Sequence, residues 1–213
     1  MSKELNLLLP LIENRKATEI NGTVYHTGVI GHHDVVAAQS GIGKVNAAIA
    51  ALTLIEAFKP DLVINSGVAG GAGPAGVLDL VIPDRIAYHD VWCGPGTVPG
   101  QAADCPLFFE CALPAGIAER LNARRGVLAS GDIFVSKPEE VERIVALYPD
   151  AVAVDMESAA IAQVCYKKGV PFICVRVVSD TPGKEDNIAQ YESFWDDAPK
   201  TTFEALTRLL SLL

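Results

Sequence analysis

The chain has 213 residues, of which half are hydrophobic and a fifth are charged, so it can bury one sizeable core within the usual length of a single domain. Its formal net charge of -9, without a cluster of Lys or Arg, argues against binding to nucleic acid or to an anionic membrane and favours a small-molecule partner. The five cysteines show neither C-x-x-C nor Cys/His spacing, so we expect no metal site, no disulfide framework and a cytoplasmic location.

A short apolar run over residues 5–12 opens the chain. It is interrupted by Asn6 and Pro10 and is followed by no small-residue cleavage site, so we do not expect a secretion signal. No apolar stretch approaches the roughly 20 residues that span a bilayer. We find no linker, repeat or low-complexity segment, and we therefore expect residues 1–213 to form a single domain.

The pattern of apolar residues predicts strands alternating with helices. Residues 23–30 and 34–39 are β-rich runs around a polar turn and predict a hairpin. From residue 44 to residue 58 the apolar side chains recur at helical spacing, with Gly43 before this segment and Pro60 after it. Further strands are predicted at 62–65, 80–86, 126–128, 152–154 and 172–178, and further helices at 114–124, 137–147, 156–168 and 194–213.

This alternation implies crossover connections and an α/β three-layer sandwich, in which helices cover both faces of a central, mostly parallel mixed sheet. In such sheets a ligand binds beyond the carboxyl ends of the strands. Segments at these positions carry small or chemically useful residues: SGIGK (40–44), NSGVAGG (65–71), AVDMESAAIA (153–162) and VRVVSDTPG (175–183). We expect these segments to be loops that form the site.

The glycine-rich segment has two possible interpretations. A Cβ at Gly67, Gly70 or Gly71 would occupy space, so glycine there would let the backbone approach a flat base or a sugar closely. Glycines that follow a strand also simply turn the chain.

Glu157 falls in the first turn of a predicted helix, at the carboxyl end of a predicted strand. The helix dipole favours a carboxylate there. The carboxylate can accept hydrogen bonds from two adjacent hydroxyls, which is what a ribose diol offers. Alternatively, the charge only stabilises the start of the helix.

Asp180 follows a nearly apolar predicted strand, with Ser179 beside it and Arg176 four residues earlier. Burial would raise the pKa of its carboxyl, whereas a neighbouring arginine would lower that pKa. The side chain could instead cap the turn before Thr181 and Pro182. These residues alone leave both interpretations open.

The motifs of the chain resemble, in order and spacing, those of the bacterial methylthioadenosine/S-adenosylhomocysteine nucleosidases of the nucleoside phosphorylase superfamily. The quoted motifs are SGIGKVNAA, NSGVAGG, YHDVWCGPG, SGDIF followed by VSKP, AVDMESAAIA and VRVVSD. A D-M-E-x-x-A-x-A run followed about 20 residues later by R-x-x-S-D is highly specific to that superfamily. The resemblance covers nearly the whole chain.

This resemblance implies a nucleoside phosphorylase-like fold and hydrolysis of the N-glycosidic bond of an adenine nucleoside, without a metal or a cofactor. Such a nucleosidase would act in methionine salvage, on 5′-methylthioadenosine or S-adenosylhomocysteine. By resemblance, Asp180 is the acid that protonates or hydrogen-bonds the purine at N7, and Ser179 orients it. Met156 and Glu157 bind the ribose. The other expected pocket residues are Phe134 and Val135 against the base, Tyr191 on the alkylthio side, and Ile42, Ala69, Gly70 and Arg176.

The water-activating base implied by the resemblance is Glu4, which is aligned through the downstream segment IENR (12–15). Relatives have an apolar first strand and a small-residue turn before this Glu, whereas three residues precede it here. The first strand is therefore missing or truncated by comparison. Our hypothesis is a start assigned too late, which an intact mass of the natural protein matching Met1 would contradict. A second departure is Val68, where relatives often have Ser and one more polar contact.

Alternative functions are a phosphorolytic purine nucleoside phosphorylase, a hydrolase of futalosine, which carries a 6-oxo purine, and a non-catalytic nucleoside-binding protein. Phosphorolysis requires arginines that bind the oxygens of phosphate, and residues 67–71 contain no arginine. Residues 91–109 mix large apolar side chains such as Trp92 with Gly and Pro, and are hard to bury within one layer. In the resembled family this loop helps to complete the neighbour's active site, so we expect a homodimer.

Overall fold

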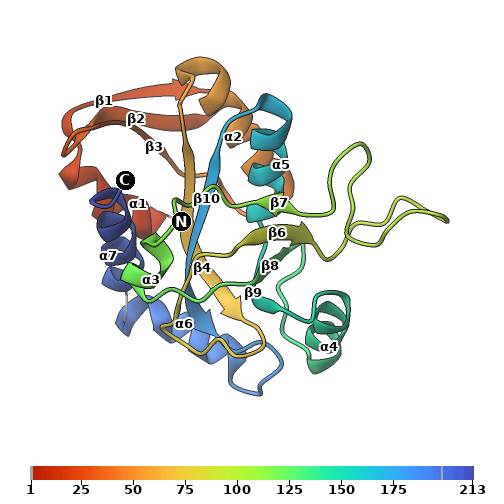
Figure 1. Cartoon of the computed structure of the whole chain (residues 1–213). Coiled ribbons are helices and arrows are strands. Elements are labelled where there is room, and N and C mark those ends of the chain that lie inside the picture. The colour runs from red at the N-terminus through yellow and green to blue at the C-terminus, as the bar shows by residue number, and fades with distance from the viewer. Residues whose placement is uncertain (1, 198) are drawn as a thin grey trace.

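The computed structural model describes residues 2–197 and 199–213. Met1, and Ala198 within the predicted final helix, lie outside the described residues. The chain forms an α/β structure with a seven-stranded mixed sheet and a separate three-stranded antiparallel sheet (Figure 1). Among the described residues, no helix has the length and apolar character needed to cross a bilayer.

The seven-stranded sheet carries the strands that surround the site. Its spatial order is β5 (Leu80–Val81), β10 (Phe172–Asp180), β4 (Val63–Gly71), β9 (Ala151–Asp155), β8 (Val127–Ser130), β6 (Arg85–Tyr88) and β7 (Phe109–Glu110). The β10–β4, β9–β8 and β8–β6 pairs are parallel. The antiparallel β5–β10, β4–β9 and β6–β7 pairs each join only two residue pairs. The predicted mostly parallel mixed sheet is therefore confirmed.

Helices cover both faces of this sheet. They are α1 (Ser2–Leu8), α2 (Lys44–Phe58), α3 (Ile117–Leu121), α4 (Pro138–Leu147), α5 (Ser158–Lys168), α6 (Asn187–Asp197) and α7 (Pro199–Leu210), with a 3-10 turn at Leu9–Leu11. Cys174 and Val178 of β10 pack toward α2 and α5, whereas Ile173, Val175 and Val177 pack toward α3, α6 and α7. This alternation follows from the two-residue period of a strand and gives three layers.

The three-stranded sheet consists of β1 (Glu13–Ile20), β2 (Thr23–Ile30) and β3 (His33–Ala38). The predicted hairpin is its β2–β3 part. We did not predict β1, because nearly all its side chains are exposed and the strand carries no apolar alternation. The one available signal was the pair Asn21 and Gly22, which both adopt positive φ in the turn before β2.

Three predicted boundaries were wrong. The strand expected at 80–86 is two strands, β5 and β6, because Pro83 lies between them and cannot donate to a ladder. The helix expected at 194–213 is two helices, α6 and α7, and α6 begins earlier, at Asn187. The segments 65–71 and 175–180 are not loops but the ends of the long strands β4 and β10. Strands hold a site more rigidly than loops do.

Candidate active site

A cavity of about 350 Å³ opens where the ends of β4, β9 and β10 meet the segments after β3 and β8. All twelve residues expected from the sequence line it: Glu4, Ile42, Ala69, Gly70, Phe134, Val135, Met156, Glu157, Arg176, Ser179, Asp180 and Tyr191. The cavity wall also includes Asn65, Ser66, Asp155 and Pro182, which we had not singled out although they lie within the quoted motifs. The structure thus brings together residues from both ends of the chain.

Asp180 is the last residue of β10, and only 3% of it is exposed. The Ser179 hydroxyl donates a hydrogen bond to its Oδ1 (2.6 Å), and the side-chain amide of Asn187 donates to its Oδ2. Burial raises the pKa of the Asp180 carboxyl, and these two hydrogen bonds offset only part of that effect. Of the two opposing influences expected from the sequence, burial therefore prevails.

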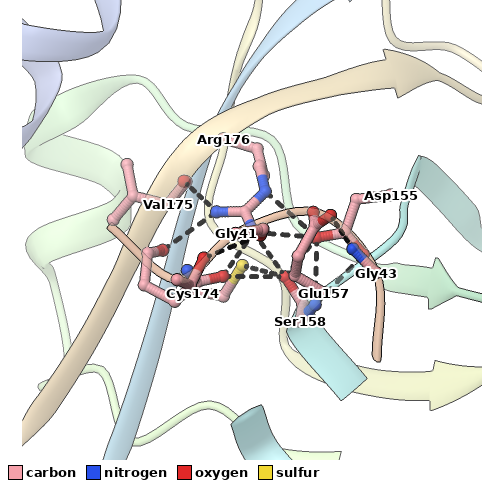
Figure 2. A network of polar contacts seen from close by, with 10 residues as sticks. Gly41, Gly43, Asp155, Glu157, Ser158, Cys174, Val175 and Arg176 are labelled. Carbon is pink, nitrogen blue, oxygen red and sulfur yellow. Dashed lines mark hydrogen bonds and ion pairs between the residues drawn. The ribbon is translucent and has the colours of Figure 1, made fainter. Parts of the chain in front are cut away.

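Arg176 lines the cavity and pairs with Asp155 rather than with Asp180 (Figure 2). Its Nε and Nη2 donate to Oδ2 of Asp155 (3.2 and 2.8 Å), and its Nη2 also donates to Oγ of Ser158 (2.7 Å) and to Oδ1 of Asn65. Its Nη1 donates to the backbone carbonyls of Asn65 (3.0 Å) and Val175 (2.9 Å). Every guanidinium nitrogen is engaged, so the arginine is anchored in the protein.

Glu157 immediately precedes α5, one residue before the helix starts at Ser158. Its Oε1 accepts a hydrogen bond from the backbone N–H of Gly43 (2.9 Å), which lies at the start of α2 (Figure 2). Burial, and then the nearby carboxylate of Asp155, raise the pKa of the Glu157 carboxyl. A group that joins the starts of two packed helices does more than complement the dipole of its own helix.

Two glycines of β4 are needed for packing inside the protein. A Cβ at Gly70 would lie 2.5 Å from Cγ of Pro182, and one at Gly71 would lie 2.6 Å from the backbone oxygen of Ala75. These two glycines make room for the protein's own packing. A Cβ at Gly67 would meet only ordinary contacts.

Glu4 reaches the cavity from α1, which packs against α7. A Cβ built on Gly67 would lie 3.6 Å from Oε1 of Glu4 and 3.5 Å from Cζ of Arg176. The carboxyl of Glu4 and the guanidinium therefore flank the same short stretch of β4.

Aromatic side chains form the outer part of the cavity. The rings of Phe134 and Tyr191 meet edge to face, with centroids 5.4 Å apart. Val135 is buried beside Phe134, whereas Ile42 is largely exposed. An apolar, partly open wall of this kind suits a flat base and an apolar substituent. Within the described part of the chain, no group of three or more His, Cys, Asp or Glu is placed to hold a metal ion.

The family model described as Phosphorylase superfamily matches residues 1–211. A Geobacillus thermodenitrificans protein named 5'-methylthioadenosine/S-adenosylhomocysteine nucleosidase is 38% identical, over all of this chain and 94% of its own length. The solved S-adenosylhomocysteine nucleosidase of Streptococcus pyogenes, in complex with 5-methylthiotubericidin, matches with a TM-score of 0.94 and 34% identity, over 100% of this chain and 94% of that one.

A futalosine hydrolase of Helicobacter pylori matches with a TM-score of 0.92 and 29% identity, over 100% of this chain and 95% of that one. The nucleosidases are the more similar of these relatives in sequence. The chain belongs to the phosphorylase superfamily and, within it, to the 5'-methylthioadenosine/S-adenosylhomocysteine nucleosidases.

Proposed function

We propose that the protein hydrolyses the N-glycosidic bond of an adenine nucleoside, such as 5′-methylthioadenosine or S-adenosylhomocysteine, and releases adenine. The observation that carries this proposal is Asp180, a buried carboxyl whose pKa is raised and whose side chain faces the same cavity as Glu157 and Glu4. A buried carboxyl whose pKa is raised, facing other acidic side chains across a cavity, is an arrangement that suits general acid catalysis. The nucleosidases in the family support the same reaction.

Cleavage of the bond between C1′ and N9 builds positive charge on the ribose and negative charge on the purine. Asp180 delivers its proton to N7 as the bonding electrons move into the base, a step that typically contributes about 10²- to 10⁴-fold in rate. Glu157 accepts hydrogen bonds from the ribose hydroxyls. Glu4 takes a proton from the water whose oxygen bonds to C1′, so that the products are the free base and the free sugar.

The hydrogen bonds of Arg176 favour water over phosphate as the attacking group. Of the described residues that line the cavity, Arg176 is the only one with a cationic side chain. Its nitrogens already donate to Asn65, Asp155, Ser158 and Val175. A phosphate ion would have to displace those partners before the guanidinium could grip it.

The test is to incubate the protein with 5′-methylthioadenosine, S-adenosylhomocysteine, inosine and futalosine, with and without phosphate, and to follow the release of free base. We expect adenine from the first two, at a rate that phosphate does not change. Dependence on phosphate would make the protein a phosphorylase, and release of base from futalosine alone would make it a futalosine hydrolase. Tight binding of an adenosine analogue without base release would make it a binding protein.

We further propose that the protein is a cytoplasmic homodimer that acts in methionine salvage. Val45, Ile49 and Leu52 recur along one side of α2 and are exposed, the first two by 69% and 49%. Trp92 and Tyr166 add two exposed aromatic rings. A second copy of the chain is the simplest partner for such an apolar surface. Light scattering should give the mass of a dimer, and Ile49→Asp should shift it toward the monomer.

A further inference from the structure

Asn187 contacts the proposed catalytic acid, although nothing in the sequence singled it out. It is the first residue of α6, and only 2% of it is exposed. Its Nδ2 donates a hydrogen bond to Oδ2 of Asp180. Its backbone N–H donates to the carbonyl of Lys184 (3.2 Å), which fixes the start of the helix. Asn187 is therefore held rigidly against one oxygen of the Asp180 carboxyl.

The orientation of the Asn187 amide determines which atom faces Asp180. With Nδ2 toward the carboxyl, the Asn187 Oδ1 is buried without a hydrogen-bond partner among the described residues. The reverse orientation would leave the NH₂ group unpartnered instead. Buried carbonyl oxygens without partners are better tolerated than buried N–H groups without partners. The amide therefore presents its donor, which pairs best with the unprotonated oxygen of the carboxyl, because the hydroxyl oxygen of a protonated carboxyl is the weaker acceptor.

The other oxygen of Asp180 has a neighbour of a different kind. Ser179 Oγ lies 2.6 Å from Oδ1 and 3.2 Å from the backbone oxygen of Ala69. The hydroxyl can accept a hydrogen bond from a protonated Oδ1 while it donates to Ala69, and it can turn to donate to Oδ1 once the proton on Oδ1 has left. The Ser179 hydroxyl can thus pair with Oδ1 in both protonation states, whereas the Asn187 amide favours the unprotonated state of Oδ2.

We infer that Asn187 is a positioning residue that keeps Oδ2 of Asp180 as a hydrogen-bond acceptor and leaves the acidic proton on Oδ1. As a consequence, the site selects 6-amino purines over 6-oxo purines. This inference rests on the proposed function, in which Asp180 faces the base. Adenine has an acceptor at N7 and, beside it, a donor at its 6-amino group. N7 can accept the proton on Oδ1 of Asp180, and the 6-amino group can donate to Oδ2. A 6-oxo purine would set its oxygen against the lone pairs of Oδ2.

The experiment compares two substrates that differ only at position six, 5′-methylthioadenosine and 5′-methylthioinosine. For the wild-type protein we expect kcat/KM to favour the amino substrate by at least about tenfold. In Asn187→Leu, Oδ2 is free to carry the proton and to donate to a 6-oxo group, so this preference should fall by about tenfold or more. An unchanged preference in a folded Asn187→Leu protein would overturn the inference. Asn187→Ala, with a smaller side chain, repeats the measurement if the leucine variant does not fold.

The pH profile gives a second readout, which a loss of packing alone would not move. Asn187 lowers the pKa of Asp180, against the larger effect of burial, so its removal should raise that pKa. The alkaline limb of kcat/KM should therefore move to higher pH in Asn187→Leu. Gln190→Ala is the matched control, because Gln190 also lies on α6 but accepts from the backbone N–H of Thr181 rather than touching the carboxyl. It should leave both the substrate preference and the alkaline limb in place.

Binding of the free bases separates this inference from the proposed function. Titration calorimetry with adenine and hypoxanthine needs no turnover. If no nucleoside releases its base, the proposed function fails, and the ratio of the two dissociation constants still tests Asn187. Tighter binding of adenine that Asn187→Leu reduces by about tenfold supports the inference, and an equal ratio in both proteins contradicts it.

Discussion

Arg176 and Asp155 form an ion pair in the interior of the protein, with Nη2 2.8 Å from Oδ2 and both side chains 2% exposed. Arg176 lies on β10 and Asp155 at the end of β9, so the pair links two strands on either side of β4. The same guanidinium donates to Asn65 of β4. One cation thus joins the three strands whose ends surround the cavity.

Asp155→Ala should lower the free energy of unfolding by about 3–5 kcal/mol, because the variant leaves the buried charge of Arg176 without its partner. Chemical denaturation at neutral pH measures this loss. The control is Glu56→Ala, which removes the partner of Lys168 in an ion pair on the surface. The control should cost less than about 1 kcal/mol. Equal losses in the two variants would contradict the structural importance of the buried pair.

Asp180→Asn should lower turnover by about 10²- to 10⁴-fold, because an amide cannot deliver a proton to the leaving base. Binding of a non-hydrolysable nucleoside analogue should persist, because the ribose contacts remain. Steady-state kinetics and calorimetry distinguish the two effects. Turnover equal to that of the wild type would remove Asp180 from the mechanism.

The rate should depend on pH in the direction set by burial of Asp180. Because burial raises the pKa of this carboxyl, the acid form persists to higher pH than it does in an exposed aspartate. We expect kcat/KM to fall as pH rises through that raised pKa. This fall of kcat/KM with rising pH should disappear in Asp180→Asn, measured on whatever activity the variant retains.

Stability should follow the same titration. A carboxyl whose pKa is higher in the folded state contributes stability that is fully present below its unfolded-state pKa and is lost as pH rises through the folded-state pKa. The unfolding free energy of the wild type relative to Asp180→Asn should therefore decline with increasing pH. Denaturation of both proteins at several pH values measures this difference. A difference that grows with pH has the wrong sign for a raised pKa.

Glu157→Gln should weaken nucleoside affinity and turnover together without destabilising the protein. A glutamine oxygen can still accept from the backbone N–H of Gly43, and the substitution removes a partly buried carboxyl whose pKa is raised. A neutral amide oxygen is a weaker acceptor for ribose hydroxyls than a carboxylate. Kinetics and thermal unfolding test the two halves of this prediction. If affinity and rate are unchanged, Glu157 only stabilises the start of its helix.

Gly71→Ala should lower the stability of the protein, whereas Gly67→Ala should lower its turnover. The methyl group at position 71 would lie 2.6 Å from the backbone oxygen of Ala75, so Gly71→Ala should cost about 1–3 kcal/mol in unfolding free energy. At position 67 the nearest atoms are 3.5 Å away, so Gly67→Ala should fold normally. Its methyl group would nevertheless stand between Glu4 and Arg176, and turnover should fall. Thermal unfolding and kinetics on both variants provide the comparison.

The sequence predicted the parts of the site that lie on strongly patterned strands. The apolar run over residues 172–178 predicted β10 and placed Asp180 beside its end, whereas the role of Asp180 as an acid came from the resemblance of VRVVSD to the family. Asn187 was not predictable, because its contact with Asp180 depends on how α6 folds back over β10, which no local pattern encodes. The close packing at Gly70 and Gly71 was not predictable for a related reason, since the atoms that a Cβ there would meet include atoms from other parts of the chain.

The two ends of the polypeptide meet where α1 packs against α7 (Figure 1). Glu4 is carried by this terminal pair of helices, whereas Asp180 belongs to the central sheet. In the proposed reaction, the group that activates water thus depends on a contact between two helices, whereas the acid is fixed in the sheet itself. Loosening of the α1–α7 contact would therefore uncouple hydrolysis from recognition of the base.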